Sequence, residues 1–385
     1  MLYRKFGRTN ELVSVLGFGC MRLPVINGIG TEIDDEKAIA MVRLAIDEGV
    51  NYVDTAYPYH GDGSHKGGAS EPFVARALKD GYRERVKLAT KLPSWLIKSR
   101  EDMDKYLNEQ LQRLETDTID FYLVHALNAG TWRTLSRLGI GEFLDQAIQD
   151  GRIRYAGFSF HDELPLFKEI VDAYQWSFCQ IQYNYLDESF QAGKEGLEYA
   201  ASKGLGITIM EPLRGGKLAK DIPGAVQKVF DQSVVKRTPA EWALRWVWNH
   251  PEVHVTLSGM NIMEQVEENL RTADAAYAGS LADEELDVIM DAEHAFRRTK
   301  VNCTGCNYCM PCPVGVNIPR NFIYYNEYYF LDSDNQRKSL QEAYTANMML
   351  EEWASVCVEC GTCEEQCPQS INIPEEMRNV AELFN

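Results

Sequence analysis

Short apolar stretches alternate with amphipathic helical stretches along residues 1–295. Eight apolar stretches have the length and composition of buried strands: VLGFGC, NYVDT, VKLATK, TIDFYLVH, IRYAGFS, FCQIQYN, GITIME and VHVTLS. Several helical stretches between them end at glycine, as helix C-termini commonly do. Nearly all-apolar strands that alternate with helices predict an α/β protein with a closed parallel (β/α)8 TIM barrel over residues 1–295. An open doubly wound sheet is the next choice, but its GxGxxG turn is absent after the first strand.

Eight of the ten cysteines lie in two runs, CTGCNYCMPCP and CVECGTCEEQCP. Three cysteines at three-residue intervals, with a fourth before proline, are typical of four-iron four-sulfur clusters. Zinc sites use four ligands per metal and leave part of each run unexplained. Disulfides need an oxidising compartment, and the N-terminus MLYRKFGRTN does not resemble a secretion signal. The runs therefore predict two [4Fe-4S] clusters in a cytoplasmic protein.

The fourth cysteine of each run in a two-cluster ferredoxin binds the other cluster. This rule predicts two ligand sets, Cys303, Cys306, Cys309 and Cys367 for one cluster, and Cys357, Cys360, Cys363 and Cys312 for the other. Cys312 departs from the bacterial pattern, because two residues rather than three precede it after the third cysteine. About 44 residues separate the runs and are predicted to be helical. Residues 296–385 thus resemble an alpha-helical ferredoxin-like module.

The composition limits the partners that the chain can have. Its 45% hydrophobic and 25% charged residues are typical of a globular protein, and no apolar run approaches the ~20 residues of a membrane span. A net charge of -18 argues against a nucleic-acid partner, which calls for a surplus of lysine and arginine. The charge is compatible with docking to a basic electron carrier.

Four side chains with complementary chemistry follow successive predicted strands of the barrel. Asp54, Tyr59, Lys91 and His125 lie at or just after the second, third and fourth strands, and the carboxyl ends of barrel strands meet in one pocket. Lys91, paired with Asp54, is expected to lower the pKa of Tyr59 from about 10, so that the phenol exchanges a proton near neutral pH. His125 is expected to orient a substrate carbonyl. A cofactor would have to supply hydride.

The stretches NYVDTAYPY, ATKLP, LVHAL, GFS, QIQYN and EPLRGGKL resemble the signatures of the aldo-keto reductases, in order along the barrel. The resemblance extends to members that carry a C-terminal ferredoxin-like extension. It implies the Asp54, Tyr59, Lys91 and His125 tetrad and a nicotinamide cofactor, NADH or NADPH. The implied cofactor contacts are Ser159 and Gln180 for the carboxamide, Met210 against the ring, Pro212, Leu213 and Gly215 for the pyrophosphate, and Ser258, Gly259, Gln265, Glu268 and Asn269 for the adenosine end. Phe160 replaces the family's asparagine, Met210 its aromatic residue, and Gln265 its arginine.

These features predict an oxidoreductase that acts on a small carbonyl or alcohol substrate. The clusters are expected to link the barrel to an electron carrier of the ferredoxin or flavodoxin type. Nicotinamide gives up two electrons together, whereas each cluster takes one, so a flavin such as FMN would serve as intermediary. Two alternatives stay open. The chain could be a plain NAD(P)H-dependent carbonyl reductase with structural or sensing clusters, or a nicotinamide-binding redox-sensing subunit with little turnover.

Overall fold

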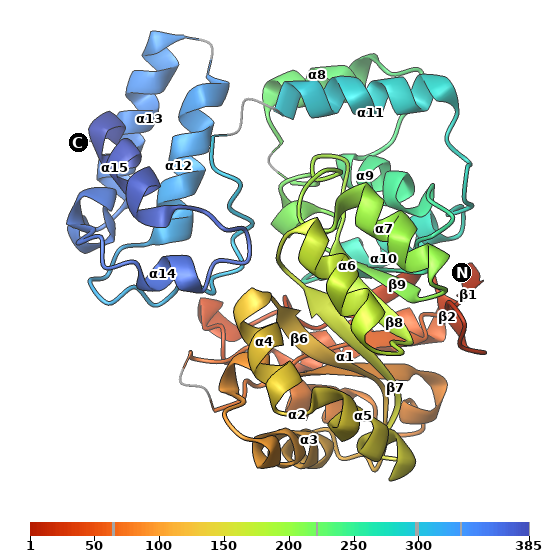
Figure 1. Cartoon of the computed structure of the whole chain (residues 1–385). Helices are drawn as coiled ribbons and strands as arrows, with labels where there is room; N and C mark the ends of the chain where they lie inside the picture. The colour runs from red at the N-terminus through yellow and green to blue at the C-terminus, as the bar shows by residue number, and fades with distance from the viewer. Residues whose placement is uncertain (64–65, 221, 297–299, 332, 385) are drawn as a thin grey trace. The chain divides into compact units, whose positions relative to one another are not determined.

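A computed structural model describes residues 1–63, 66–220, 222–296, 300–331 and 333–384, and it contains a closed barrel of parallel strands (Figure 1). The barrel strands are β3 (Leu16–Gly19), β4 (Tyr52–Asp54), β5 (Lys87–Leu92), β6 (Ile119–Leu127), β7 (Ile153–Phe160), β8 (Phe178–Gln182), β9 (Gly206–Met210) and β10 (Val255–Ser258). They follow one another around the barrel in chain order, and β10 closes it by pairing with both β9 and β3. All eight coincide with the apolar stretches, so the predicted (β/α)8 barrel is confirmed.

Strand β6 shows why the apolar stretches become barrel strands. Its sequence IDFYLVHAL is buried at every position except Ala126, as expected when both the barrel interior and the outer helices cover a strand. The pairing of β6 with β7 shifts register between Val124 and Leu127, and Ala126 has a positive φ of 49°. Such irregularities often redirect a side chain beside a functional site, and this one contains His125.

Helices cover the outside of the barrel (Figure 1). Those of the barrel region are α1 (Asp35–Asp47), α2 (Ser70–Ala77), α3 (Arg100–Arg113), α4 (Ala129–Arg137), α5 (Ile140–Gln149), α6 (Leu164–Ala173), α7 (Gly193–Ser202), α9 (Pro239–Trp248) and α10 (Met263–Ala273). Helix α5 buries Ile140, Phe143, Leu144 and Ala147, which lie on one face at helical spacing. Helix α3 begins with a capping box between Ser99 and Asp102.

An N-terminal hairpin supplies the residue that fills the amino end of the barrel. Strands β1 (Tyr3–Lys5) and β2 (Leu12–Ser14) pair antiparallel, and Phe6 follows β1 with no exposed surface. The Phe6 ring lies 4.9 Å from Phe121 and 5.6 Å from Phe178, between ring centroids. Aromatic packing therefore closes this end, which leaves the carboxyl end of the strands for a site.

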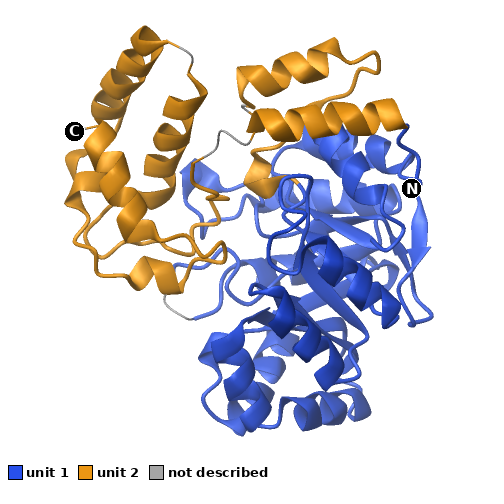
Figure 2. Ribbon diagram, turned by 45° about the horizontal axis from the view of Figure 1, so that its top comes forward, with its two compact units in different colours: residues 1–212, 240–282 blue, residues 213–239, 283–385 orange. Residues whose placement is uncertain are grey.

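The chain divides into two compact units (Figure 2). The first comprises residues 1–212 and 240–282, and the second comprises residues 213–239 and 283–385. The helices of the second unit are α8 (Gly224–Gln232), α11 (Asp283–Phe296), α12 (Ile318–Phe330), α13 (Asp334–Asn347), α14 (Thr362–Glu365) and α15 (Ile373–Phe384). The sequence motifs predict a boundary between residues 295 and 296. The two units divide the chain differently, because α8 packs against α11 and both helices belong to the second unit.

The C-terminal part of the second unit is helical and has its own aromatic core. Helices α12 and α13 occupy the linker between the cysteine runs, where the sequence predicts helix. Tyr344 is fully buried, donates a 2.6 Å hydrogen bond to Asn321 and accepts one from the Ala354 amide. Among the described residues, none of the helices is both long and apolar enough to cross a bilayer.

Candidate functional site

Lys91 organises the carboxyl end of the barrel. Its Nζ lies 2.7 Å and 2.8 Å from the two carboxylate oxygens of Asp54, 2.8 Å from the Thr55 carbonyl and 3.3 Å from the Tyr59 hydroxyl. Lys91 has no exposed surface, and Asp54 is 2% exposed. Strands β4 and β5 pair side by side and place these two residues, while Tyr59 follows β4 in a short turn. The structure thus brings together the three residues that the sequence pattern singled out.

The expected lowering of the Tyr59 pKa is wrong for this structure. Burial raises the pKa of Tyr59 well above its ordinary value, and Asp54 and Glu211 raise it further, whereas Arg22 opposes them. The charge of Lys91 is already balanced by Asp54, which binds it through both carboxylate oxygens. Burial likewise raises the pKa of Asp54 and lowers that of Lys91, while the ion pair opposes both shifts. Tyr59 is therefore a neutral phenol over the physiological pH range.

His125 completes the group from β6. It is 4% exposed, and its ring centroid lies 6.1 Å from that of Tyr59. Burial lowers the pKa of His125 well below its usual range, and the neighbouring Lys91 adds to this. The imidazole is therefore neutral and can take part in hydrogen bonds with a substrate oxygen. Its Nδ1 atom is buried and has no hydrogen-bond partner among the residues that the structure describes, and a bound molecule could supply one.

Two of the predicted nicotinamide contacts lie on the neighbouring strands. The Ser159 hydroxyl accepts a 2.7 Å hydrogen bond from the Ala126 amide, at the register shift of β6. Gln180 donates from Nε2 to the Met210 sulfur at 3.5 Å, while no described residue forms a hydrogen bond with its buried Oε1. A free acceptor suits a carboxamide, which carries two N–H donors. Phe160, where the resemblance has asparagine, lies instead 5.1 Å from the Phe167 ring of α6.

The predicted contacts of the adenosine end lie in the loop after β10 and in α10. The Ser258 hydroxyl accepts a 3.0 Å hydrogen bond from buried Asn269, and the Gln265 side chain accepts one from the Asn261 amide at 2.9 Å. The Arg22 side chain lies against the open face of Gly259. Glu268 is half-buried, and its backbone carbonyl accepts from Thr272. These residues lie in one region, and the two buried ones, Ser258 and Asn269, are already hydrogen-bonded to each other.

The predicted pyrophosphate loop after β9 spans the division between the units. Pro212 is buried at the end of the first unit. Leu213 begins the second unit, followed by a 3-10 turn, η4 (Arg214–Gly216), in which Gly215 has a φ of 68°. A Cβ atom on Gly215 would lie 1.9 Å from the carbonyl oxygen of Thr304, in the first cysteine run. The space beside the Gly215 Cα is therefore occupied by the Thr304 carbonyl of the same chain.

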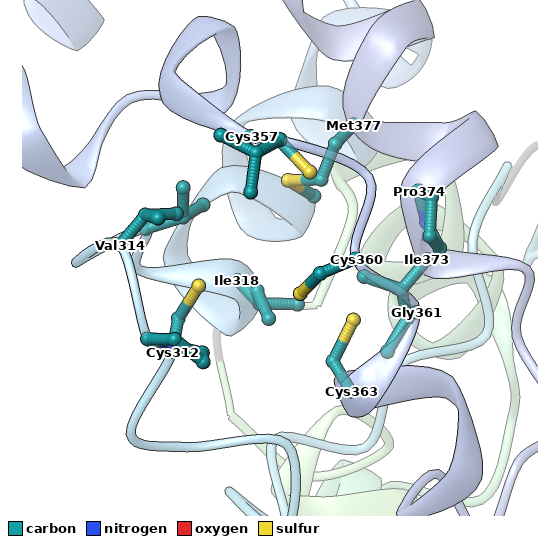
Figure 3. Close-up of a pocket in the computed structure, with 13 residues that line it drawn as sticks. Cys312, Val314, Ile318, Cys357, Cys360, Gly361, Cys363, Ile373, Pro374 and Met377 are labelled. Atoms are coloured by element: carbon teal, nitrogen blue, oxygen red, sulfur yellow. The ribbon is translucent and has the colours of Figure 1, made fainter.

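The eight clustered cysteines line two separate cavities in the second unit. One cavity has four of them in its wall, namely Cys303, Cys306, Cys309 and Cys367. The other is lined by Cys312, Cys357, Cys360 and Cys363, as Figure 3 shows. Each cavity thus collects three cysteines of one run and the last cysteine of the other, in the grouping that the sequence rule gives.

The electrostatics of the thiols reflect the same grouping. Burial raises the pKa of Cys309, and Cys306, Cys303 and Cys367 raise it further. Burial raises the pKa of Cys363 to about 11, with added contributions from Cys357, Cys312 and Cys360. Within the described ranges, no three cysteine, histidine or carboxylate side chains are placed to hold a single metal ion. Four thiols around one cavity are the ligand number of a [4Fe-4S] cluster.

A repeat in the sequence explains why the two cavities are alike. The segments CPVGVNIP, from Cys312 to Pro319, and CPQSINIP, from Cys367 to Pro374, share the pattern Cys-Pro-x-x-apolar-Asn-Ile-Pro. Each asparagine accepts a hydrogen bond from the amide three residues later, and a helix follows, α12 or α15. Ile318 and Ile373, both buried, line both cavities. They therefore form an apolar wall shared by the two candidate cluster sites.

Three further residues beside Tyr59 and His125 were not identified from the sequence. Trp95 follows β5, is 39% exposed, and has its ring centroid 5.2 Å from that of His125. Arg22 and Glu211 follow β3 and β9 and approach to 3.9 Å, and both act on the Tyr59 pKa. Their positions directly after barrel strands are a signal that could have found them. The Asn-Ile-Pro repeat was equally visible in the sequence.

Two known protein families match separate parts of the chain. Residues 15–287 match the model of the Aldo/keto reductase family. Residues 302–373 match a 4Fe-4S dicluster domain. The first match covers all eight barrel strands and the helices α1 to α10, and the second covers both cysteine runs and the helices between them.

Individual relatives resemble the barrel. A 6-dehydroglucose reductase from Novosphingobium aromaticivorans is 29% identical over 273 residues, which is 67% of this chain and 85% of that protein. An L-galactose dehydrogenase from Arabidopsis thaliana is 27% identical over 288 residues, 69% of this chain and 86% of that protein. Among solved structures, the holo form of the aldo-keto reductase AKR11C1 from Bacillus halodurans superposes with a TM-score of 0.62 and 27% identity, over 76% of this chain and 96% of that one.

Proposed function

Because this chain belongs to the aldo/keto reductase family, and is therefore an oxidoreductase, we propose that its barrel reduces the carbonyl group of a small molecule at Tyr59. The observation that carries this proposal is the hydrogen bond between the Lys91 ammonium and the Tyr59 hydroxyl, with Asp54 behind the ammonium. A phenol beside a buried ammonium can donate its proton, because the ammonium stabilises the phenolate that remains.

Each residue of the group has a distinct role in the proposed reaction. Tyr59 gives its proton to the substrate oxygen, and its raised pKa keeps that proton available at neutral pH. Lys91 stabilises the phenolate that remains, and Asp54 holds Lys91 in position. Neutral His125 donates a hydrogen bond to the substrate carbonyl and orients it. Trp95, exposed beside His125, offers an aromatic surface to the rest of the substrate.

A nicotinamide cofactor would supply the hydride. The residues present fit its carboxamide, since Gln180 presents a buried acceptor with no partner in the described part of the chain, and Ser159 lies on the next strand. We propose Met210 for the ring, Pro212 and Leu213 for the pyrophosphate, and Ser258, Gly259, Gln265, Glu268 and Asn269 for the adenosine end. Gly215, which the sequence also assigned to the pyrophosphate, has the Thr304 carbonyl in the space beside its Cα. The chain leaves the preference between NADH and NADPH open, because Gln265 has no charge with which to recognise a 2′-phosphate.

The two cysteine-lined cavities fit a pair of [4Fe-4S] clusters, one held by Cys303, Cys306, Cys309 and Cys367 and the other by Cys312, Cys357, Cys360 and Cys363. Clusters of this kind carry single electrons. We propose that they connect the barrel to an external carrier of the ferredoxin or flavodoxin type, in the reducing cytoplasm, with a flavin such as FMN as the intermediary between paired and single electrons. Cys360, the most exposed of the eight thiols, marks the second cluster as the one closer to solvent.

A plain NAD(P)H-dependent carbonyl reductase is the second candidate. It is favoured by the reductase and dehydrogenase named above, whose similarity to this chain extends over the length of a barrel. In this case the clusters would stabilise the second unit or sense oxygen, and carbonyl reduction would proceed without them.

Substitution of a cluster ligand distinguishes the candidates. We expect Cys360→Ala to lower carbonyl reduction driven by reduced methyl viologen by roughly tenfold or more, because the solvent-facing cluster loses a ligand. Ser355→Ala, an exposed non-ligand just before the same run, should leave the rate unchanged. The measurement is an anaerobic assay with a panel of carbonyl substrates, with either viologen or NAD(P)H as the donor.

The outcomes of this assay are separable. Loss of activity in both Cys360→Ala and Tyr59→Phe supports transfer through the clusters. Loss in Tyr59→Phe alone, with a folded Cys360→Ala protein, would overturn that transfer and favour the plain reductase. Absence of turnover with every carbonyl tested, together with tight nucleotide binding, would replace both by a redox-sensing subunit.

A further inference from the structure

A buried carboxylate that the proposed reaction does not use lies beside the strand that carries Lys91. Glu71, the second residue of α2, has no exposed surface. Its Oε1 atom accepts hydrogen bonds from the Thr90 hydroxyl and from Gln110 Nε2, both at 2.7 Å, and its Oε2 atom accepts one from Arg113 Nε at 2.8 Å. Burying a carboxylate is unfavourable unless its oxygens are hydrogen-bonded and its charge is paired, and both conditions are met here.

The first oxygen of Glu71 is connected to the strand of the ammonium. Gln110, from α3 and without exposed surface, donates from the same Nε2 atom to the Lys91 carbonyl at 3.0 Å. Its Oε1 atom accepts a 2.8 Å hydrogen bond from the Tyr122 hydroxyl on β6. Thr90, the other donor to this oxygen, directly precedes Lys91 on β5. One side of the carboxylate is therefore bound to the backbone that places the Lys91 side chain.

The second oxygen of the carboxylate is connected, through Arg113, to the backbone of Tyr59. Arg113 donates from Nη2 to the carbonyl of Gly68. Gly68 is buried, and its amide donates to the Tyr57 carbonyl at 2.7 Å. A Cβ atom on Gly68 would lie 2.0 Å from the Tyr59 carbonyl oxygen, which also accepts a 3.2 Å hydrogen bond from the Ser70 amide. The turn that carries the phenol therefore packs on the segment that Arg113 holds.

We propose that the ion pair of Glu71 and Arg113 sets the distance between the phenol and the ammonium of the site. The inference rests on the proposed role of Tyr59 as proton donor. The phenol and the ammonium come from separate segments, the turn after β4 and strand β5, and lie 3.3 Å apart. The ion pair is connected to β5 on one side and, through Gly68, to the turn on the other. Both of its members act through the backbone and are therefore positioning residues.

Arg113→Met tests the inference in the full-length protein with its clusters. We expect kcat for carbonyl reduction to fall roughly 10- to 100-fold, because a displacement of about 1 Å at a reacting group has an effect of this size. KM and the nucleotide affinity, measured by calorimetry, should stay within about twofold of the wild type, since the pocket keeps its lining. A role in stability alone would leave kcat of the folded enzyme unchanged.

Arg83→Met is the matched control. Arg83 pairs at 2.9 Å with Asp120, a carboxylate that is 3% exposed, lies at the start of β6 and also accepts a hydrogen bond from the Leu88 amide. This variant likewise removes an arginine from a buried carboxylate, but at the amino end of the barrel. It should lower the midpoint of urea unfolding, as Arg113→Met does, and leave kcat within about twofold of the wild type.

Two combined variants separate position from stability. Glu71→Gln together with Arg113→Met removes both charges, so most of the lost stability should return. Its kcat should stay low, because the Gly68 carbonyl still lacks its donor. In a Tyr59→Phe protein, Arg113→Met should have almost no additional effect on kcat, since the phenol through which it acts is already absent.

Four results would overturn the inference. A wild-type kcat in Arg113→Met, or in the neutral double variant if the single one does not fold, would mean that the ion pair serves the fold alone. An equal fall of kcat in Arg83→Met would indicate a general loosening of the barrel. A full effect of Arg113→Met in the Tyr59→Phe protein would show that it does not act through the phenol. If Tyr59→Phe is itself as active as the wild type, the proposed function fails and the inference fails with it, whereas the other three results leave that function intact.

Discussion

Tyr59→Phe is expected to lower kcat/KM for carbonyl reduction roughly 100- to 10,000-fold, the usual contribution of a positioned general acid. The substitution removes the hydroxyl that lies 3.3 Å from the Lys91 Nζ and keeps the ring that packs beside His125. The pocket keeps its shape, so the loss should appear mainly in kcat, with nucleotide affinity unchanged. Steady-state kinetics and nucleotide titration measure the two effects.

Tyr57→Phe provides the matched control. Tyr57 lies in the same stretch and is 4% exposed, but its hydroxyl donates to Glu109 at 3.0 Å, away from Lys91. Its replacement should leave kcat/KM within about twofold of the wild type. The raised pKa of Tyr59 further implies that deprotonation of this phenol does not lower the wild-type rate of reduction as the pH rises from neutral toward the ordinary pKa of tyrosine. A Tyr59→Phe enzyme as active as Tyr57→Phe would remove Tyr59 from the chemistry.

Lys91→Met should reduce both activity and stability. It leaves Asp54, 2% exposed, as a buried carboxylate without its partner, and breaking a buried ion pair in this way costs about 3–5 kcal/mol. It also removes the counter-charge of the phenolate, so kcat should fall by roughly 100-fold or more. Denaturant unfolding followed by tryptophan fluorescence measures the first effect, and steady-state kinetics the second.

The double variant Lys91→Met with Asp54→Asn separates the two effects. Removing both charges together avoids the unpaired carboxylate, so most of the lost stability should return. Activity should remain at the level of the single variant, because the ammonium beside Tyr59 is still absent. Recovery of activity along with stability would mean that Lys91 acts through the fold and not on the reaction.

Much of the barrel could be predicted from the sequence, because its physical cause is local. A strand covered on both faces is mostly apolar, as β6 shows, with Asp120 and His125 as its charged or polar exceptions. The convergence of Asp54, Tyr59, Lys91 and His125 follows from topology alone, since every parallel strand ends at the same rim. The cysteine grouping follows from the spacing of the runs.

The pKa of Tyr59 and the packing of the side chains around the site could not be predicted in the same way. Whether Lys91 lowers or fails to lower the Tyr59 pKa depends on how fully Asp54 neutralises it and on how deeply the phenol is buried. Both are properties of packing and not of the motif. Phe160 is similar, since its sequence position suggests the cofactor while its ring packs on Phe167.

Long-range contacts were the least accessible feature. Gly215 belongs to a recognisable loop, but nothing in that loop indicates that Thr304, far along the chain, fills the space beside its Cα. The contact arises from tertiary folding of the second unit.

The most direct test of the account is the iron and acid-labile sulfide content of protein purified without air. Two cavities, each lined by four cysteines, predict about eight irons and about eight sulfides per chain, with paramagnetic signals from two clusters after reduction. Flavin absorption in the same sample would identify the intermediary. Protein that is folded and active yet contains zinc, or no metal at all, would contradict the claim that electron-carrying clusters share this chain with the Tyr59 site.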